Sequence, residues 1–162
     1  MSKAKYNRWV DEFADSIYRF ALKNTRDTEV AKDLVQDAFE KLWIKKDLID
    51  PSKAKAYLFQ IVNRSLIDRG RRNKLVLAFQ EQISALPAVQ LVEEFDVKQT
   101  LDDAVNKLPE IQRHVVLLRD YEGYSYAEIG EITQLNEQQV KVYIFRARQK
   151  LRSLLTDPEL IL

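Results

Sequence analysis

A run of positive charge without acidic residues lies near the C-terminus of the chain, at residues 141–152. It contains five lysines and arginines and neither aspartate nor glutamate, and Gln138 stands just before it. Lysine and arginine neutralise phosphates, whereas glutamine and lysine can also hydrogen-bond the edges of adenine and guanine in the major groove. The composition therefore indicates contact with a polyanion such as duplex DNA, and the alternative is a solvated helix face.

A second basic region, residues 57–72, combines aromatic, amide and arginine side chains. Tyr57, Gln60, Arg64 and Arg71 recur at helical spacing and would share one face of a helix. An aromatic ring beside amides and arginines suits stacking on unpaired bases, with the phosphates held alongside. The alternative is that Tyr57 merely covers the apolar core.

No grouping of residues predicts an enzyme or a metal site. The chain has no cysteine and a single histidine, His114, so thiolate and multi-histidine metal sites are excluded. The carboxylates Asp33, Asp37 and Glu40 have helical spacing but no partner that would complete a metal site, and there is no glycine-rich phosphate loop. We therefore expect no catalytic residue, no metal and no cofactor, and we interpret His114 as a surface or interhelix residue.

Two helix-start signals position the C-terminal basic run. Ser125 and Glu128 have the spacing of a capping box, and Asn136 and Gln139 repeat it. These signals predict a short helix over residues 126–133, a tight turn, and a longer helix from residue 137. That order is the helix-turn-helix pattern, whose second helix enters the major groove. Gly130, which lacks a side chain, would let the second helix cross the first closely.

The remaining chain is also expected to be helical. Apolar residues recur at helical spacing over 10–21 and 30–42, and Asp50-Pro51 has the form of an N-cap before a helix that runs through Leu66. Pro109 restarts a helix, and Gly123 fits the position just past its end. Only three glycines and four prolines are present, which argues against a β-sandwich or barrel with many tight turns.

We predict an all-α fold of two small helical domains, residues 1–74 and 98–162, the second containing the helix-turn-helix. Residues 75–97 are apolar, acidic toward their C-terminal end and interrupted by Pro87. We interpret them as a connector, and a further core helix is the alternative. The formal net charge of +1 is the sum of +6 on residues 1–74, −4 on residues 75–97 and −1 on residues 98–162. Neither a run of 18 apolar residues nor a signal peptide is found, so we expect a cytoplasmic protein.

Three longer motifs occur in a recognisable order: DLVQDAFEKLW at 33–43, AYLFQIVNRSLIDRGRR at 56–72, and LPEIQRHVVLLRDYEGYSYAEIGEITQLNEQQVKVYIFRARQKL at 108–151. In these motifs the chain resembles the extracytoplasmic-function sigma factors, the small two-domain class of bacterial sigma factors. The resemblance covers nearly the whole chain outside the connector. It implies a subunit that binds core RNA polymerase and recognises promoter DNA.

The resemblance also implies roles for three groups of residues. The β′ clamp helices of the polymerase would be bound through Asp33, Leu34, Gln36, Asp37, Phe39 and Trp43. The −10 promoter element would be read and melted through Tyr57, Gln60, Asn63, Arg64, Arg69, Arg71 and Arg72. The C-terminal domain would sit on the β flap and read the −35 element through Glu137, Gln138, Gln139, Lys141, Val142, Phe145, Arg146, Arg148 and Arg152. Sequestration by a membrane-bound anti-sigma factor is common in the family.

The sequence departs from the family pattern at several of these positions. Tyr57 stands where the family usually has tryptophan, and Gly70 interrupts a basic run. The family's base-reading asparagine aligns with Arg64 and not with Asn63, so either could contact a flipped base. Residues 138–143 read QQVKVY where the family favours GTVKSR. A stand-alone helix-turn-helix regulator and a helical interaction module without a DNA role are the alternatives from other functional classes.

Overall fold

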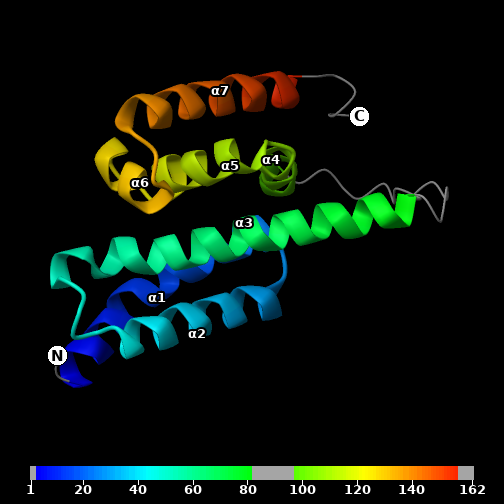
Figure 1. Ribbon diagram of the computed structural model, residues 1–162. Helices are drawn as coiled ribbons and strands as arrows, with labels where there is room; N and C mark the ends of the chain where they lie inside the picture. Colours follow the sequence, from blue (N-terminus) through cyan, green and yellow to red (C-terminus); the bar gives the residue numbers. More distant parts are fainter. Residues whose placement is uncertain (1–2, 82–96, 157–162) are drawn as a thin grey trace.

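The computed structural model describes residues 3–81 and 97–156, and every regular element in these two ranges is a helix (Figure 1). This confirms the predicted all-α fold. The elements are α1 (Lys3–Thr25), α2 (Thr28–Ile44), the 3-10 turn η1 (Pro51–Lys53), α3 (Ala54–Glu81), α4 (Val97–Asn106), α5 (Glu110–Val116), the π-helical turn η2 (Leu117–Tyr121), α6 (Tyr126–Thr133) and α7 (Glu137–Thr156). No helix in the described ranges is both long enough and apolar enough to span a membrane.

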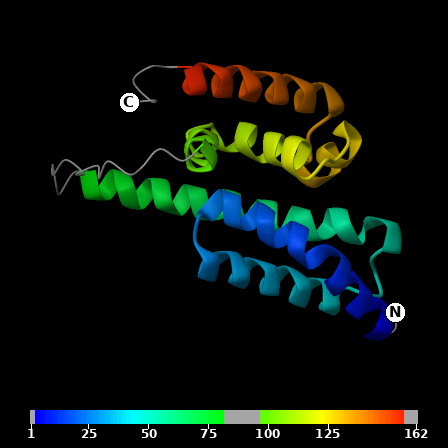
Figure 2. The ribbon, with the colours of Figure 1, turned by 180° about the vertical axis from the view of Figure 1, so that it is seen from behind.

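The N-terminal half is a bundle of three helices. Figure 2 shows α1 and α2 packed together on one side of α3. Asp27 caps α2 by accepting hydrogen bonds from the backbone N–H groups of Glu29 and Val30. The predicted Asp50 cap is also present, since its carboxylate accepts from the N–H of Ser52 at the start of η1. These caps satisfy N–H groups that have no partner inside the helix.

The C-terminal half is built around the helix-turn-helix, and both predicted capping pairs are confirmed. Ser125 and Glu128 exchange two hydrogen bonds at the start of α6, which spans the predicted residues. Asn136 and Gln139 do the same at the start of α7. The role expected of Gly130 was wrong in detail: a methyl group there would lie 2.7 Å from the carbonyl oxygen of Leu135, in the turn, so the turn and not α7 requires the glycine.

The two halves pack face to face and share one apolar core. The ring of Phe59 on α3 meets the ring of Tyr124 at 5.1 Å between centroids, and Phe20 on α1 meets His114 on α5 at 5.7 Å. From one side to the other the layers are α1 with α2, then α3, then α4 to α6, and finally α7 (Figure 1). Helix α3 continues to Glu81, so the start of the predicted connector is helical, and residues 82–96 lie outside the described residues.

Candidate nucleic-acid interface

Helix α7 has one buried face and one open face. Val140, Ile144 and Ala147 are buried against the rest of the C-terminal half. Because a helix turns 100° per residue, the opposite face carries Gln138 and Val142. It also carries Phe145, and Val142 and Phe145 keep 45% and 61% of their surfaces exposed. The helix therefore holds its position through one stripe and leaves the other free for a ligand.

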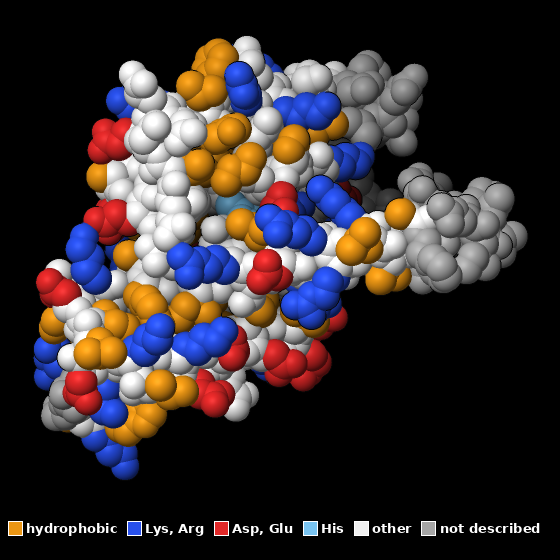
Figure 3. Space-filling model, viewed as in Figure 1, with side chains coloured by type: hydrophobic (Ala, Val, Ile, Leu, Met, Phe, Trp, Pro, Cys, Tyr) orange, Lys and Arg blue, Asp and Glu red, His pale blue; other side chains and the backbone are white. Residues whose placement is uncertain are grey.

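The structure divides the predicted −35 residues into free and engaged side chains. Gln139 accepts a hydrogen bond from the backbone N–H of Asn136, so its amide is used by the cap. Arg148 makes two hydrogen bonds to Asp120, at 2.6 and 3.2 Å, and this carboxylate raises the pKa of its guanidinium. The remaining predicted side chains are exposed along α7: Glu137, Gln138, Lys141, Val142, Phe145, Arg146 and Arg152. Basic and hydrophobic side chains accordingly alternate over α7 (Figure 3).

Tyr126, at the start of α6, lies between two basic residues and was not singled out from the sequence. The guanidinium carbon of Arg119 is 4.6 Å from its ring centroid, and the Lys141 ammonium is 5.6 Å away. Cations at this distance over a ring are attracted to its electron-rich face. The ring thus holds Lys141 near the N-terminal end of the open face of α7.

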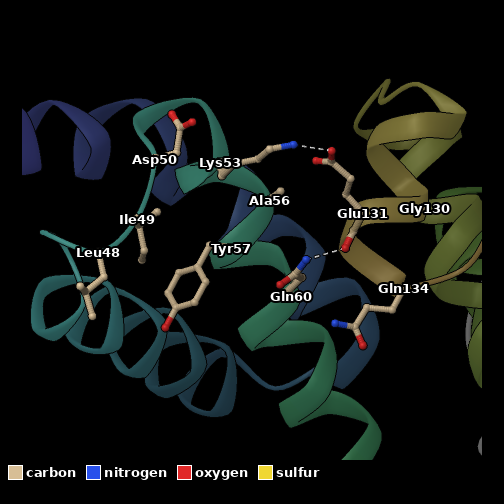
Figure 4. A pocket seen from close by; sticks show the side chains of 10 residues that line it. All are labelled: Leu48, Ile49, Asp50, Lys53, Ala56, Tyr57, Gln60, Gly130, Glu131 and Gln134. Carbon is tan, nitrogen blue, oxygen red and sulfur yellow. Dashed lines mark hydrogen bonds and ion pairs between the residues drawn. The ribbon is translucent and has the colours of Figure 1, made fainter.

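The predicted −10 residues Tyr57 and Gln60 lie half-buried at the mouth of a cavity of about 550 Å³ between the two halves (Figure 4). The cavity combines apolar walls with a few polar groups. Besides these two residues its lining comprises Leu48, Ile49, Asp50, Lys53, Ala56, Gly130, Glu131 and Gln134. The sequence signal that could have found this lining is Asp50-Pro51, because the cap fixes residues 48–50 beside the first turns of α3.

Helix α6 closes one side of this cavity. The Lys53 ammonium contacts the Glu131 carboxylate at 2.6 Å, and Gln60 donates a hydrogen bond to the backbone oxygen of Glu131 (Figure 4). Glu131 raises the pKa of Lys53, whereas hydrogen bonds from Ser52 lower the pKa of Asp50. The polar groups of the predicted −10 region are therefore partly engaged by the other half of the chain.

The four predicted −10 arginines lie along the outside of α3, but Asn63 does not. Asn63 is buried, and its side-chain oxygen has no hydrogen-bond partner. Which of Asn63 and Arg64 contacts an extruded base stays a prediction, and the arrangement described here favours Arg64, which is exposed and can reach a ligand. Gly70 lies beside the C-terminal half: a methyl group at this position would lie 2.6 Å from the carboxylate of Glu110, the end of a flexible side chain that can move aside.

Predicted polymerase-binding residues on α2 also differ in accessibility. Phe39 was predicted to bind the polymerase, but it is only 6% exposed and its ring meets Tyr6, so in this arrangement it belongs to the core. Trp43 is 40% exposed, with Tyr6 against its ring and the Lys46 ammonium 4.0 Å from the ring centroid. Asp33 and Gln36 are exposed, Leu34 is half-buried, and Asp37 pairs with Lys41 at 3.1 Å.

His114 is an interhelix residue and not a surface residue. It is fully buried, and both ring nitrogens lack a hydrogen-bond partner. Burial, helped by the neighbouring Arg113, lowers the pKa of His114 to about 3, so the ring is neutral near pH 7. Within the described residues no group of histidine and carboxylate side chains could hold a metal ion.

Comparison with known proteins matches both halves of the chain. Residues 9–76 match the family described as Sigma-70 region 2, and residues 98–151 match the family described as Sigma-70, region 4. The ECF RNA polymerase sigma factor SigM of Bacillus subtilis (strain 168) is 29% identical over 146 residues, covering 88% of this chain and 90% of the relative. SigW of the same organism is 26% identical over 163 residues, covering 91% and 87%.

A solved structure supports the same relationship. The sigma factor RpoE, in a co-crystal structure with the anti-sigma factor NepR from Bartonella quintana, matches with a TM-score of 0.75 and 25% identity. The match covers 94% of this chain and 98% of RpoE. The two family matches take up about three quarters of the chain and leave out mainly the connector. The chain therefore belongs to the extracytoplasmic-function sigma factors, which direct bacterial RNA polymerase to promoters.

Proposed function

We propose that α7 reads the −35 promoter element, that α3 engages the −10 element, and that the exposed end of α2 binds core RNA polymerase. The observation that carries this proposal is the layering: helices α7 and α2 lie in opposite outer layers (Figure 1). Helix α7 carries the open face, and α2 carries the exposed Trp43. One protein surface can therefore hold the polymerase while another faces duplex DNA.

For the −35 element, the side chains fall into two roles. Gln138 and Lys141, near the N-terminus of α7, contact base edges, as the first residues of a recognition helix do. Arg146 and Arg152 contact phosphates, which fixes the register of the helix on the duplex. The engagement of Gln139 and Arg148 within the protein argues against a direct base contact for either.

For the −10 element, the cavity beside Tyr57 supplies what an extruded base requires. The apolar side chains and the ring of Tyr57 offer a new stacking surface, and Asp50 and Gln60 offer hydrogen-bonding groups at its edge. The arginines along the outside of α3 would hold the phosphates of the same strand, listed from its N-terminal end as Arg64, Arg69, Arg71 and Arg72.

The protein partners follow from the family. Polymerase binding would use Trp43 as an aromatic anchor, with Asp33, Gln36 and Asp37 around it. RpoE is bound to an anti-sigma factor, and we propose that this chain also binds a protein of that class. That such a partner is membrane-bound is implied only by the resemblance to the family. We place the protein in the cytoplasm, where RNA polymerase acts, as a binding protein and not as an enzyme.

Equilibrium binding to purified core polymerase tests this assignment. Trp43→Ala should weaken binding by about 2 kcal/mol or more, as expected for a central aromatic at an interface. Asp37→Lys should also weaken it. Glu29→Lys, a charge reversal at the other end of the same helix, is the matched control and should bind as the wild type does. Equal affinities of Trp43→Ala, Asp37→Lys and the wild type, with unchanged helix content, would contradict the proposed polymerase surface.

A further inference from the structure

We propose that Val142 and Phe145 form an apolar step on α7 that reads the 5-methyl groups of thymine in duplex DNA. The proposal deepens the −35 assignment and rests on it. It states that the promoter element recognised by this protein contains at least one thymine whose methyl group contributes to recognition.

The first support is the position of the two side chains. Residues three apart on a helix are surface neighbours, so Val142 and Phe145 form one continuous apolar area. They lie on the face opposite the buried residues Val140 and Ile144, and nothing in the core depends on them. Two large apolar side chains, 45% and 61% exposed, are thus held outward by a rigid helix.

The second support is the charge around this apolar area. Exposed cations flank it on α7, and α7 has no acidic residue after Glu137. The flanking side chains are Lys141 and Arg146, and Arg152 lies about two turns further along the helix. The major groove offers a complementary pattern, because phosphates line both sides and thymine methyl groups project between them. An apolar protein partner would have to carry its own acidic rim to match this surface.

The third support is the pair of amides at the two ends of the step. Gln138 precedes Val142 by four residues and Gln149 follows Phe145 by four, so all four side chains share one stripe on the open face. Glutamine pairs with adenine through two hydrogen bonds, and apolar side chains contact the methyl group of thymine. The stripe therefore favours A·T pairs, because its glutamines suit the adenine and its apolar side chains suit the thymine.

The experiment replaces thymine by deoxyuridine, which removes only the methyl group. Holoenzyme reconstituted with core polymerase first selects duplexes from a library with a random −35 region. In the most enriched duplex each −35 thymine is then changed singly to deoxyuridine. We expect at least one change to weaken binding of wild-type holoenzyme about fourfold, the value for one buried methyl group. Holoenzyme carrying Val142→Ala or Phe145→Ala should not respond to that change.

Controls separate this inference from the assignment on which it rests. Leu75→Ala removes an exposed apolar side chain from α3 and should keep the wild-type response to deoxyuridine. If scrambling the −35 region does not affect binding, the −35 assignment itself fails. If scrambling weakens binding but every deoxyuridine duplex binds as the parent does, the thymine inference alone is overturned. It is also overturned if both alanine variants keep the full methyl response, or if the selected element contains no thymine on either strand.

Discussion

Helices α3 and α7 both carry the amides and arginines that we propose contact nucleic acid, yet the rest of the chain contacts them differently. The outward face of α7 lies in the outermost layer, away from the N-terminal half (Figure 1). Helix α3 is the layer of the N-terminal half that faces the C-terminal half, with α1 and α2 on one side and α5 and α6 on the other. Its polar residues near the cavity already contact α6, as in the hydrogen bond from Gln60 to Glu131.

We infer from this difference that the two proposed promoter contacts become available separately. The open face of α7 can meet a duplex in the arrangement described here, whereas a strand that binds beside Tyr57 must compete with α6 for Gln60. Each ion pair described between the halves joins a base from the N-terminal half to an acid from the C-terminal half: Arg19–Glu122, Lys23–Asp102, Arg26–Asp103, Lys53–Glu131 and Lys55–Glu128. Most of these side chains are at least partly exposed, so each pair contributes little and the arrangement is sensitive to salt.

The largest expected effect concerns the open face of α7. Replacing Lys141 by alanine should change which −35 sequences are preferred, by about 1–3 kcal/mol for a lost base contact. Replacing Arg152 should weaken all duplexes alike and reduce the salt dependence, because a phosphate contact carries no sequence information. Binding of reconstituted holoenzyme to a panel of −35 variants at two salt concentrations measures both.

If Lys141→Ala and replacement of Arg152 have the same effect, the proposed base-reading role of α7 is wrong. A uniform loss of affinity for Lys141→Ala, with the same change in salt slope as Arg152→Ala, would mean that α7 makes only phosphate contacts. Lys150 is a further exposed cation on α7, and we expect Lys150→Ala to have the same effect as Arg152→Ala.

The next effect concerns His114, which joins α5 to α1 through Phe20. Because burial lowers the pKa of His114 to about 3, the unfolded chain takes up a proton below about pH 6.5 that the folded chain does not. The free energy of unfolding should therefore fall as the pH drops below about 6.5, with a loss of about 2 kcal/mol at pH 5 from this group. Urea unfolding of the wild type and of His114→Leu at pH 7.5 and pH 5 measures it.

His114→Leu removes both unpartnered nitrogens and leaves the carboxylates unchanged, so the difference between the two proteins isolates the histidine. The variant should lose less stability than the wild type between the two pH values. Identical losses would show that the ring gains a proton acceptor or water on protonation, and that the contact between α5 and α1 is looser than described.

The smallest expected effect concerns the closure of α6 over α3. Glu131→Lys turns the contact with Lys53 into a repulsion and should raise the population of separated halves by no more than about fivefold, because both charges are exposed. The chain has no cysteine, so spin labels at introduced cysteines replacing Lys32 and Ser153 report only the distance between the halves. Pulsed electron paramagnetic resonance at low and high salt measures the distribution of distances between the two labels.

The double variant Lys53→Glu/Glu131→Lys restores an ion pair of opposite sense and is the matched control. It should return the distance distribution to that of the wild type. If the charge swap leaves the halves as separated as Glu131→Lys does, the contribution of Glu131 does not come from its charge.

Local signals in the sequence predicted most of the elements. The capping pairs Ser125 with Glu128 and Asn136 with Gln139 predicted the bounds of α6 and the start of α7, because a cap depends on side chains only three residues apart. Periodic apolar residues over 10–21 and 30–42 predicted helices there for the same reason, and these ranges lie within α1 and α2. The π-helical turn η2 after α5 was not predicted, since it has no comparable local signal.

Which site residues are accessible was decided by the tertiary structure. Sequence spacing placed Asn63 and Phe39 on helices of the predicted binding regions, but packing buries both. It placed Gln139 and Arg148 on α7, but a cap and Asp120 engage them. Gly70 lies against Glu110, and His114 is buried against Phe20. In both cases the two residues belong to different halves and are 40 or more positions apart in the sequence. Helix periodicity and capping act within one or two turns, so the sequence determined the elements, whereas contacts between distant segments decided which side chains remain free.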